Sequence, residues 1–360
     1  MMLALALGAF ILGTTILLYN RALAMSSMIA QRGEMQQNAR AGVGMLSTDI
    51  SLAGAGMPTG GIQLPSGNGS TLSFFGKDTT KSYITNNTYP TGNYMNYVLP
   101  GPGAGMRTSA AGPNTDSVTI VYSDNTYTGL YQYPLVAMAA NGSSIQFDNR
   151  TNPAINNAAN GLTVGDLLLI SNNLGFAVGE VTNVNANGTV ALANNDTLKI
   201  NQTGAAGGNV ATITGGGCGA GPPIKPCVLT TAMRILVISY FLDVPPGPDG
   251  LVYTADDGPP RLMRQISGHP PTPVAENISD LQFTYDIFDT NSSIVTANLK
   301  DAGESQGKSP GQIRKVNIWL TGRTPLFGSN ASNAMTHGYQ YVQLGTSVSA
   351  RDMSFRDRYN

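Results

Sequence analysis

The first 57 residues constrain the fold most, because they have the pattern of one continuous helix with two unlike halves. Residues 1–18, MMLALALGAFILGTTILL, include no charged side chain. At 1.5 Å per residue, such a helix extends about 27 Å, close to the thickness of the hydrocarbon core of a bilayer. Tyr19 and Arg21 follow in the positions of interfacial anchors. The first half therefore requires lipid or other apolar helices around it.

Beyond Arg21, apolar residues continue at spacings of mostly three or four, which predicts an amphipathic helix over residues 22–57. The positions on this stripe are Leu23, Met25, Met28, Ile29, Met35, Ala39, Val43, Leu46, Ile50 and Ala53. Glycines at positions 33, 42 and 44 each cost roughly 1 kcal/mol relative to alanine, so this half needs tertiary packing. Gly54, Gly56 and Pro58 predict the end of the helix.

Two other interpretations of the apolar run stay open at this point. Ala22-Leu23-Ala24 provides the small-x-small cleavage site of a secretory signal peptide. Against a signal peptide, no Lys or Arg precedes the run, and the apolar pattern continues past Ala24. A plain single-span membrane anchor is the third interpretation. We favour a retained helix of a filament protein, because only that class uses both halves.

The composition indicates a polar surface that is nearly uncharged. Only 11% of the residues are charged, against roughly 25% in an average soluble protein, and the net charge is −1. We expect no nucleic acid partner, because phosphate binding needs a basic surface. A surface of amides and hydroxyls suits an exported protein that packs side by side with other copies, where an unpaired charge would be costly to bury. The alternative is a loop-rich β protein with no special surface.

Cys218 and Cys227 are the only two cysteines, and they lie in the short Gly/Pro-rich segment GGGCGAGPPIKPC. We predict that they form a disulfide, which would contribute about 2.5–3 kcal/mol by restricting the unfolded chain. A close pair in an otherwise cysteine-free chain fits an oxidising compartment. A metal site at this pair is not expected, because the only histidines, His269 and His337, are distant in sequence.

The rest of the chain predicts a β-rich head. Residues 58–115 are rich in Gly, Ser, Thr and Asn and are expected to be loops with at most short strands. The predicted strands are Ser117–Tyr122, Asp166–Ile170, Phe176–Val181, Thr189–Ala193, Arg234–Leu242, Leu281–Asp286, Ile313–Leu320 and Tyr339–Leu344. The fold class is therefore α+β: a long N-terminal α-helix (1–57) packed on a mainly antiparallel β-sheet head (58–360), with a loop-rich insertion at 58–115.

Several segments resemble the type IV pilin superfamily, most closely the PilW-type minor pilins and more distantly the type II secretion minor pseudopilin J. The resemblance covers nearly the whole chain in scattered blocks, and it rests on the order in which these blocks follow one another. The blocks are MMLALALGAFILG, QQNARAGVGMLSTDISLAGAGMP, GDLLLISNNLGFAVGEVTNV, PRLMRQISG, VAENISDLQFTYDI, IRKVNIWLTGRT and VQLGTSVSARDMSFRDR. In the family, the second block is where the helix ends in an aspartate, an Ala-Gly pair and a loop.

One departure concerns the start of the sequence. Members of the family begin with a short basic leader, a Gly at the cleavage site and a Glu at the fifth mature position, and none of these is present here. Met1-Met2-Leu3 resembles residues shortly after that Glu. We expect either that the leader and first mature residues precede this sequence or that the protein does without them. In the second case, processing by the prepilin peptidase and Glu-assisted assembly would not apply.

The resemblance implies a structural subunit of an extracellular filament, in which the apolar helix halves bundle in the core and the heads form the wall. The residues expected in that core are Leu3, Leu5, Leu7, Phe10, Ile11, Leu12, Ile16 and Leu17. The expected partners are copies of this chain or other pilins, and the inner membrane before assembly. The alternatives are a minor pilin that primes assembly at the tip, and an adhesive pilin whose loops at 59–115 and 141–160 bind a surface or a glycan.

The densest carboxylate cluster suggests a calcium site. Asp243, Asp249, Asp256 and Asp257 lie in LDVPPGPDGLVYTADDGPP, where Gly and Pro turns carry hard oxygen ligands that suit Ca²⁺. The segment lacks the spacing of an EF-hand, and the alternative is an Asp-rich turn that satisfies its own backbone. We expect no enzymatic activity, because the sequence has no nucleophile elbow, P-loop or metal-ligand spacing. A membrane-tethered secreted enzyme is the remote alternative.

Overall fold

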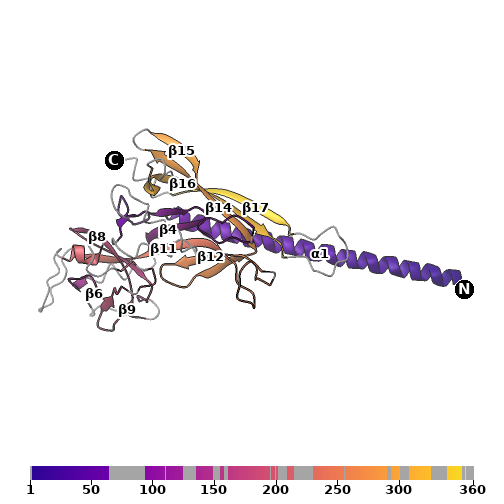
Figure 1. Cartoon of the computed structure of the whole chain (residues 1–360), viewed down its shortest axis with the longest axis horizontal. Coiled ribbons are helices and arrows are strands. Elements are labelled where there is room, and N and C mark those ends of the chain that lie inside the picture. The colour runs from indigo at the N-terminus through magenta and orange to yellow at the C-terminus, as the bar shows by residue number, and fades with distance from the viewer. Residues whose placement is uncertain are drawn as a thin grey trace.

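The computed structural model describes residues 2–64, 94–109, 111–124, 135–148, 155–157, 161–194, 196–198, 200–201, 209–214, 230–254, 256–289, 293–300, 308–325, 339–350 and 353. These residues form one long N-terminal helix and antiparallel β-sheets, so the α+β class is confirmed. Figure 1 shows the helix lying against the β-rich head with its C-terminal part and projecting from it toward the N-terminus.

Helix α1 runs without a break from Met2 to Ser51. Its 50 residues extend about 75 Å. Beyond Ser51 the chain turns, with Gly54 at φ 81° and Gly56 at φ 69°, a left-handed backbone that favours glycine. The N–H of Gly54 then donates to the carbonyl oxygen of Val121. The helix therefore ends at Ser51 rather than at residue 57, because these glycines leave the helical conformation before the predicted boundary.

The C-terminal sheet has four antiparallel strands in the order β15-β14-β16-β17. They are β14 (Ile278–Asp289), β15 (Ile294–Leu299), β16 (Ile313–Arg323) and β17 (Tyr341–Ser349). A short 3-10 helix, η6 (Pro310–Gln312), leads into β16. Helix α1 packs on β16 and β17, which run beside it in Figure 1.

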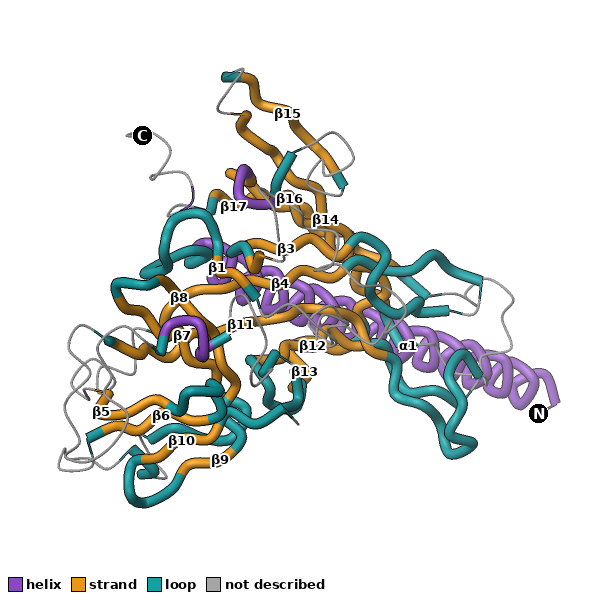
Figure 2. Tube along the Cα trace, turned by 60° about the vertical axis from the view of Figure 1, so that its left-hand side comes forward, coloured by secondary structure: helices purple, strands orange, loops and turns teal. Residues whose placement is uncertain are grey.

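The central sheet has the order β13-β12-β11-β4-β3, with β7 also paired to β11 and β8 paired to β7. Its strands are β3 (Val98–Gly101), β4 (Ser117–Ser123), β7 (Leu167–Asn172), β8 (Gly175–Glu180), β11 (Thr231–Asp243), β12 (Arg261–Ile266) and β13 (Thr272–Glu276). The long strand β11 pairs with β7 through its first residues and with β12 through its last ones. It therefore connects the distal part of the head with the part beside α1 (Figure 2).

A smaller sheet, in the order β5-β6-β10-β9, lies at the distal end of the head (Figure 2). Its strands are β5 (Leu135–Met138), β6 (Ser144–Phe147), β9 (Asn183–Val184) and β10 (Thr189–Ala191), and the 3-10 helix η4 (Val210–Ile213) packs nearby on β7 and β8. A two-stranded ladder pairs β1 (Ile62–Gln63) with β2 (Tyr94–Met95). Short strands in the 58–115 region agree with the sequence prediction for that segment.

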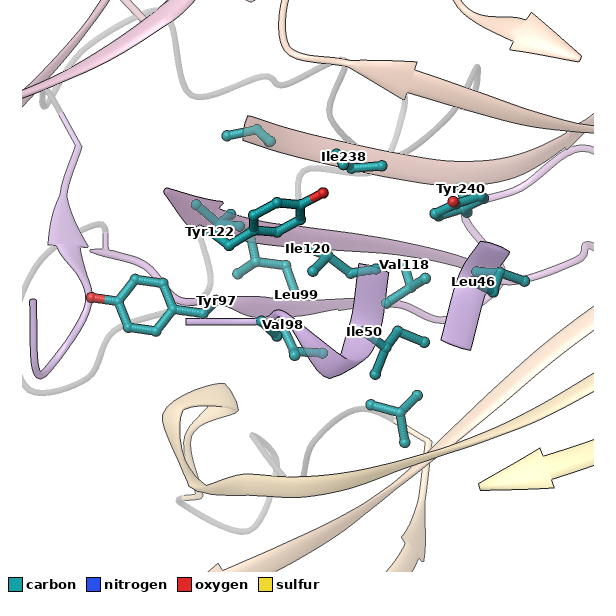
Figure 3. Close-up of a cluster of buried hydrophobic side chains, with 14 of the residues drawn as sticks. Leu46, Ile50, Tyr97, Val98, Leu99, Val118, Ile120, Tyr122, Ile238 and Tyr240 are labelled. Carbon is teal, nitrogen blue, oxygen red and sulfur yellow. The ribbon is translucent and has the colours of Figure 1, made fainter. Parts of the chain in front are cut away.

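The head has two hydrophobic cores that share strand β7. Leu46 and Ile50 of α1 belong to the main core with Val118 and Ile120 of β4, as Figure 3 shows. The smaller core includes side chains from β5, β6, β8 and β10. Successive residues of β7 alternate between the two cores, so this strand is buried on both faces and reads as a continuous apolar run.

All eight predicted strands overlap strands of the structure. The largest boundary difference is at the last one: β17 begins at Tyr341 and continues to Ser349, because every residue of it pairs with β16. The sequence did not single out β5, β6 or β15 as strands. β5 and β6 have only four residues each, and polar residues interrupt the apolar ones in β6 and β15.

Candidate functional site on the projecting helix

The apolar half of α1 projects from the head with its side chains exposed. The exposed fractions are 79% for Leu3, 71% for Phe10 and 66% for Leu12. Of the residues predicted for a filament core, Leu3, Leu7, Phe10, Ile11, Leu12, Ile16 and Leu17 are all exposed, and the side chain of Leu5 lies outside the described part of the chain. Because apolar residues occupy the whole circumference, this segment is suited to lipid or to a helix bundle rather than to water.

The exposed part continues beyond the apolar run. Leu23, Met25 and Ile29 of the predicted stripe are 52%, 66% and 70% exposed. The first polar contacts with the head involve Gln340, whose Nε2 lies 3.5 Å from the sulfur of Met28 and whose Oε1 accepts from Nε of Arg32. Close packing on the head therefore begins near Met35 rather than at residue 22.

From Met35 onward, the helix packs closely against the sheets, and this contact surface is called the seat below. Met35, Ala39, Leu46 and Ile50 are at most 5% exposed. Gly42 allows the closest approach, because a Cβ placed on it would lie 3.0 Å from Leu262 of β12 and 3.5 Å from both Ala275 of β13 and Leu320 of β16. Gly44 faces the other way, with nothing within 4 Å of a Cβ placed there.

A buried carboxylate fixes the C-terminal part of the helix to three strands. Asp49 is 5% exposed. Its Oδ1 accepts from the hydroxyl of Tyr122 at 3.0 Å, and its Oδ2 accepts from the hydroxyl of Tyr240 at 2.6 Å. The guanidinium of Arg264 donates to both oxygens, from Nε at 2.9 Å and from Nη2 at 3.3 Å. One helix residue is thus joined to β4, β11 and β12.

The electrostatics keep Tyr122, Tyr240 and Arg264 protonated. Burial raises the pKa of Tyr122 and of Tyr240 well above the usual value, and the Asp49 carboxylate raises both further. Burial lowers the pKa of Arg264, but the hydrogen bonds and charge of Asp49, together with Tyr240, raise it by more in total, so the net shift is upward. Both hydroxyls therefore remain donors and the guanidinium remains charged, so that Asp49 has four donors and one compensating charge.

The sequence pattern alone does not reveal this cluster. Tyr240 and Arg264 face each other only because of the β11–β12 register, and Tyr122 comes from another strand. One signal was available: Asp49 lies on the apolar face between Leu46 and Ile50, where a buried acid requires a partner.

The four aspartates proposed for calcium each have partners within the head. Asp243 forms an ion pair with Arg261, with Oδ2 3.0 Å from Nη2. Oδ1 of Asp249 accepts from the N–H of Leu251 at 2.8 Å. Asp256 and Asp257 both accept from the hydroxyl of Thr254, and Asp257 also accepts from backbone N–H groups of its turn. These bonds are those of an Asp-rich turn, and calcium binding stays a prediction.

The part of the chain that the structure describes contains no group of three or more His, Cys, Asp or Glu residues that could hold a metal ion. Cys218 and Cys227 lie outside the described residues, as do residues 65–93 of the loop-rich insertion and parts of 141–160. The disulfide and the adhesive loops therefore stay predictions.

A second polar cluster lies away from α1, where the turn after β12 meets β7 and β8. Nε2 of His269 lies 3.0 Å from Oδ1 of Asp166, and Arg234 lies 3.5 Å from the other oxygen of that carboxylate. Nearby, burial raises the pKa of Glu180 to about 7, and Asp196 contributes to the shift. Glu180 accepts from the N–H groups of Thr197 and Leu198, so these groups hold the loop after β10.

Comparisons of the chain with protein-family models, with curated proteins and with solved structures found no match. Within the described residues, one helix is long and apolar enough to cross a membrane. That helix is α1, so the N-terminal helix is a candidate membrane span or signal sequence.

Proposed function

We propose that the protein is a structural subunit of a type IV pilus-like extracellular filament, assembled by bundling of the projecting half of α1. The observation that carries this proposal is the contrast along one unbroken helix. Apolar side chains are exposed around the whole N-terminal part, and a closely packed head holds the remainder. A cleaved signal sequence needs no such seat, and a simple anchor needs no helix that continues through the head.

The energetics of assembly follow from this contrast. Before assembly, lipid surrounds the projecting half; in the filament, copies of the same helix do. Both surroundings are apolar, so the transfer changes little free energy, and helix packing together with head contacts decides the equilibrium. Gly8 and Gly13 have nothing within 4 Å of a Cβ placed on them, and small residues at such positions let a second helix approach closely.

The buried Asp49 cluster supports the proposal from the other end of the helix. A filament with a regular wall needs each head at the same angle to its helix. Four hydrogen bonds to Asp49 and the seat around Gly42 define that angle. The nearly uncharged surface removes much of the cost of packing heads side by side.

Electron cryo-microscopy of filaments sheared from the source cells would test the proposal. We expect continuous density for this chain along the shaft, with residues 2–20 bundled on the axis. Shafts built of another protein, with this chain present only in trace amounts, would favour a tip or priming role. Protein found solely as a monomer in the membrane or culture fluid would contradict the filament proposal.

A further inference from the structure

The C-terminal sheet ends in a long edge strand beside α1. Strand β17 pairs with β16 over nine residues in continuous register, from Tyr341 to Ser349. Among the described strands, β16 is the only neighbour of β17. Within the described part of the chain, no strand therefore pairs with the other edge of β17.

The register shows which backbone groups face that edge. The N–H of Ala350 donates to the carbonyl oxygen of Arg314, and the N–H of Thr324 donates to that of Gln340. Since bonding alternates along an antiparallel strand, the even-numbered residues of β17 bond to β16. The odd-numbered residues, from 341 to 349, therefore direct their N–H and C=O groups outward.

The strand itself lacks the charge, proline and bulge by which natural proteins prevent edge pairing. The strand, YVQLGTSVS, contains no charge and no proline, and its register with β16 has no bulge. Edge strands are normally protected by lysine, proline, bulges or short length, because open backbone groups recruit another strand. A long unprotected edge is thus suited to pairing.

We propose that β17 pairs with strand β15 of a neighbouring copy of this chain, so that the C-terminal sheets of adjacent subunits become continuous. β15 is the opposite edge of the same sheet, it is uncharged, and it exposes Ile294 and Val295 at 59% and 61%. Each neighbouring pair in this sheet is antiparallel, so β15 and β17 run in opposite directions. Copies with parallel helices therefore present β15 antiparallel to β17.

The size and position of the contact place it within the filament and not in a free dimer. A six-residue strand is about 20 Å long, and a register shift in the β14–β15 pairing leaves only the first part of β15 regular. Stable complexes bury about 800 Å² per partner, more than so short a contact provides. The pairing consequently rests on the proposed function: α1, which packs along β17, first brings copies side by side.

Amide hydrogen exchange at single-residue resolution would test this pairing on the full chain, in detergent and after assembly into filaments by detergent removal. We expect the outward amides of Gln343, Gly345 and Ser347 to exchange about ten-fold or more slowly in the filament. The inward amides of Val342 and Leu344 bond to β16 in both states and serve as the internal reference. Filaments in which the outward amides exchange as fast as in the monomer would overturn the pairing and leave the filament proposal intact. Failure to assemble at all would overturn both.

A pair of variants at one position separates edge pairing from folding. Gln343→Pro removes an outward N–H without removing a bond to β16, whereas Gln343→Thr keeps that N–H. We expect both variants to remain folded, and Gln343→Pro alone to lose the protection at Gly345 and Ser347 in filaments. Equal protection in the two variants would contradict the proposal.

Discussion

The two halves of α1 share one continuous helical backbone and have opposite surroundings. Phe10 is 71% exposed, whereas Leu46 is fully buried in the head. In the projecting half, specificity has to come from another molecule, because the chain offers these side chains no partner among the described residues. In the seated half, a buried ion pair and a close glycine contact determine how the helix lies. One helix thus combines an exposed apolar surface with a closely packed attachment to the head.

The strongest test of this comparison removes the buried carboxylate. Asp49→Ala leaves Arg264 and two tyrosine hydroxyls without their acceptor, and breaking a buried pair in this way costs about 3–5 kcal/mol. We expect the free energy of unfolding of the head, measured by chemical denaturation of the detergent-solubilised chain, to fall by that amount.

The matched control replaces the pair together. Asp49→Leu with Arg264→Met leaves no uncompensated charge, so its cost should be clearly smaller. Glu34→Ala, on an exposed position of the same helix, should change the stability by less than about 0.5 kcal/mol. An Asp49→Ala variant as stable as Glu34→Ala would show that the cluster does not hold the helix.

The second test acts on the projecting half. Leu12→Lys places a charge in the middle of the apolar run, which costs about 2.5–3.5 kcal/mol at the centre of a bilayer. We expect loss of membrane insertion and of filament assembly, while the unfolding transition of the head stays unchanged because Leu12 contacts none of it. Flotation with lipid vesicles and denaturation of the same preparation measure the two effects. A destabilised head would contradict the division of the helix into two functional halves.

The sequence predicted the projecting half of α1 better than the half that packs on the head, for physical reasons. The apolar run and the eight predicted strands depend on local pattern, and each overlaps the expected helix or strand of the structure. The start of the close packing was not predictable, because Met25 and Ile29 continue the apolar stripe although burial against the head begins only near Met35. The Asp49 cluster depends on which residues the sheet register brings opposite one another, and a single sequence does not encode that locally.

The third test compares two glycines that differ in which side of the helix they face. Gly42→Leu would insert a side chain against Leu262 and Ala275, and overpacking of this kind costs about 1–3 kcal/mol. Gly44→Leu points into open space and should stabilise the helix by up to about 1 kcal/mol. Thermal unfolding of the two variants measures the difference. Equal effects would show that the seat adapts and does not define the angle between helix and head.

The smallest expected effect concerns pH, which should act on the head and leave the projecting half unaffected. The hydrogen bond that His269 donates to the Asp166 carboxylate raises the pKa of His269 above its usual value, even though burial and the nearby Arg234 oppose the rise. Because the folded pKa lies above the unfolded one, the stabilisation is complete below about pH 6.5 and is lost as the pH rises through the folded value.

For a half-exposed ion pair, that loss amounts to about 0.2–1 kcal/mol. The stability of the wild-type head should therefore fall as the pH rises above about 6.5, and His269→Gln should reduce the slope. The pKa of Glu180 is raised to about 7, so this group also makes the head less stable as the pH rises. Its contribution falls in a lower range, between its unfolded pKa of 4.5 and 7. Helix bundling should show no such dependence, since residues 2–18 contain no titratable side chain. An unchanged slope in His269→Gln would assign the pH response to another group.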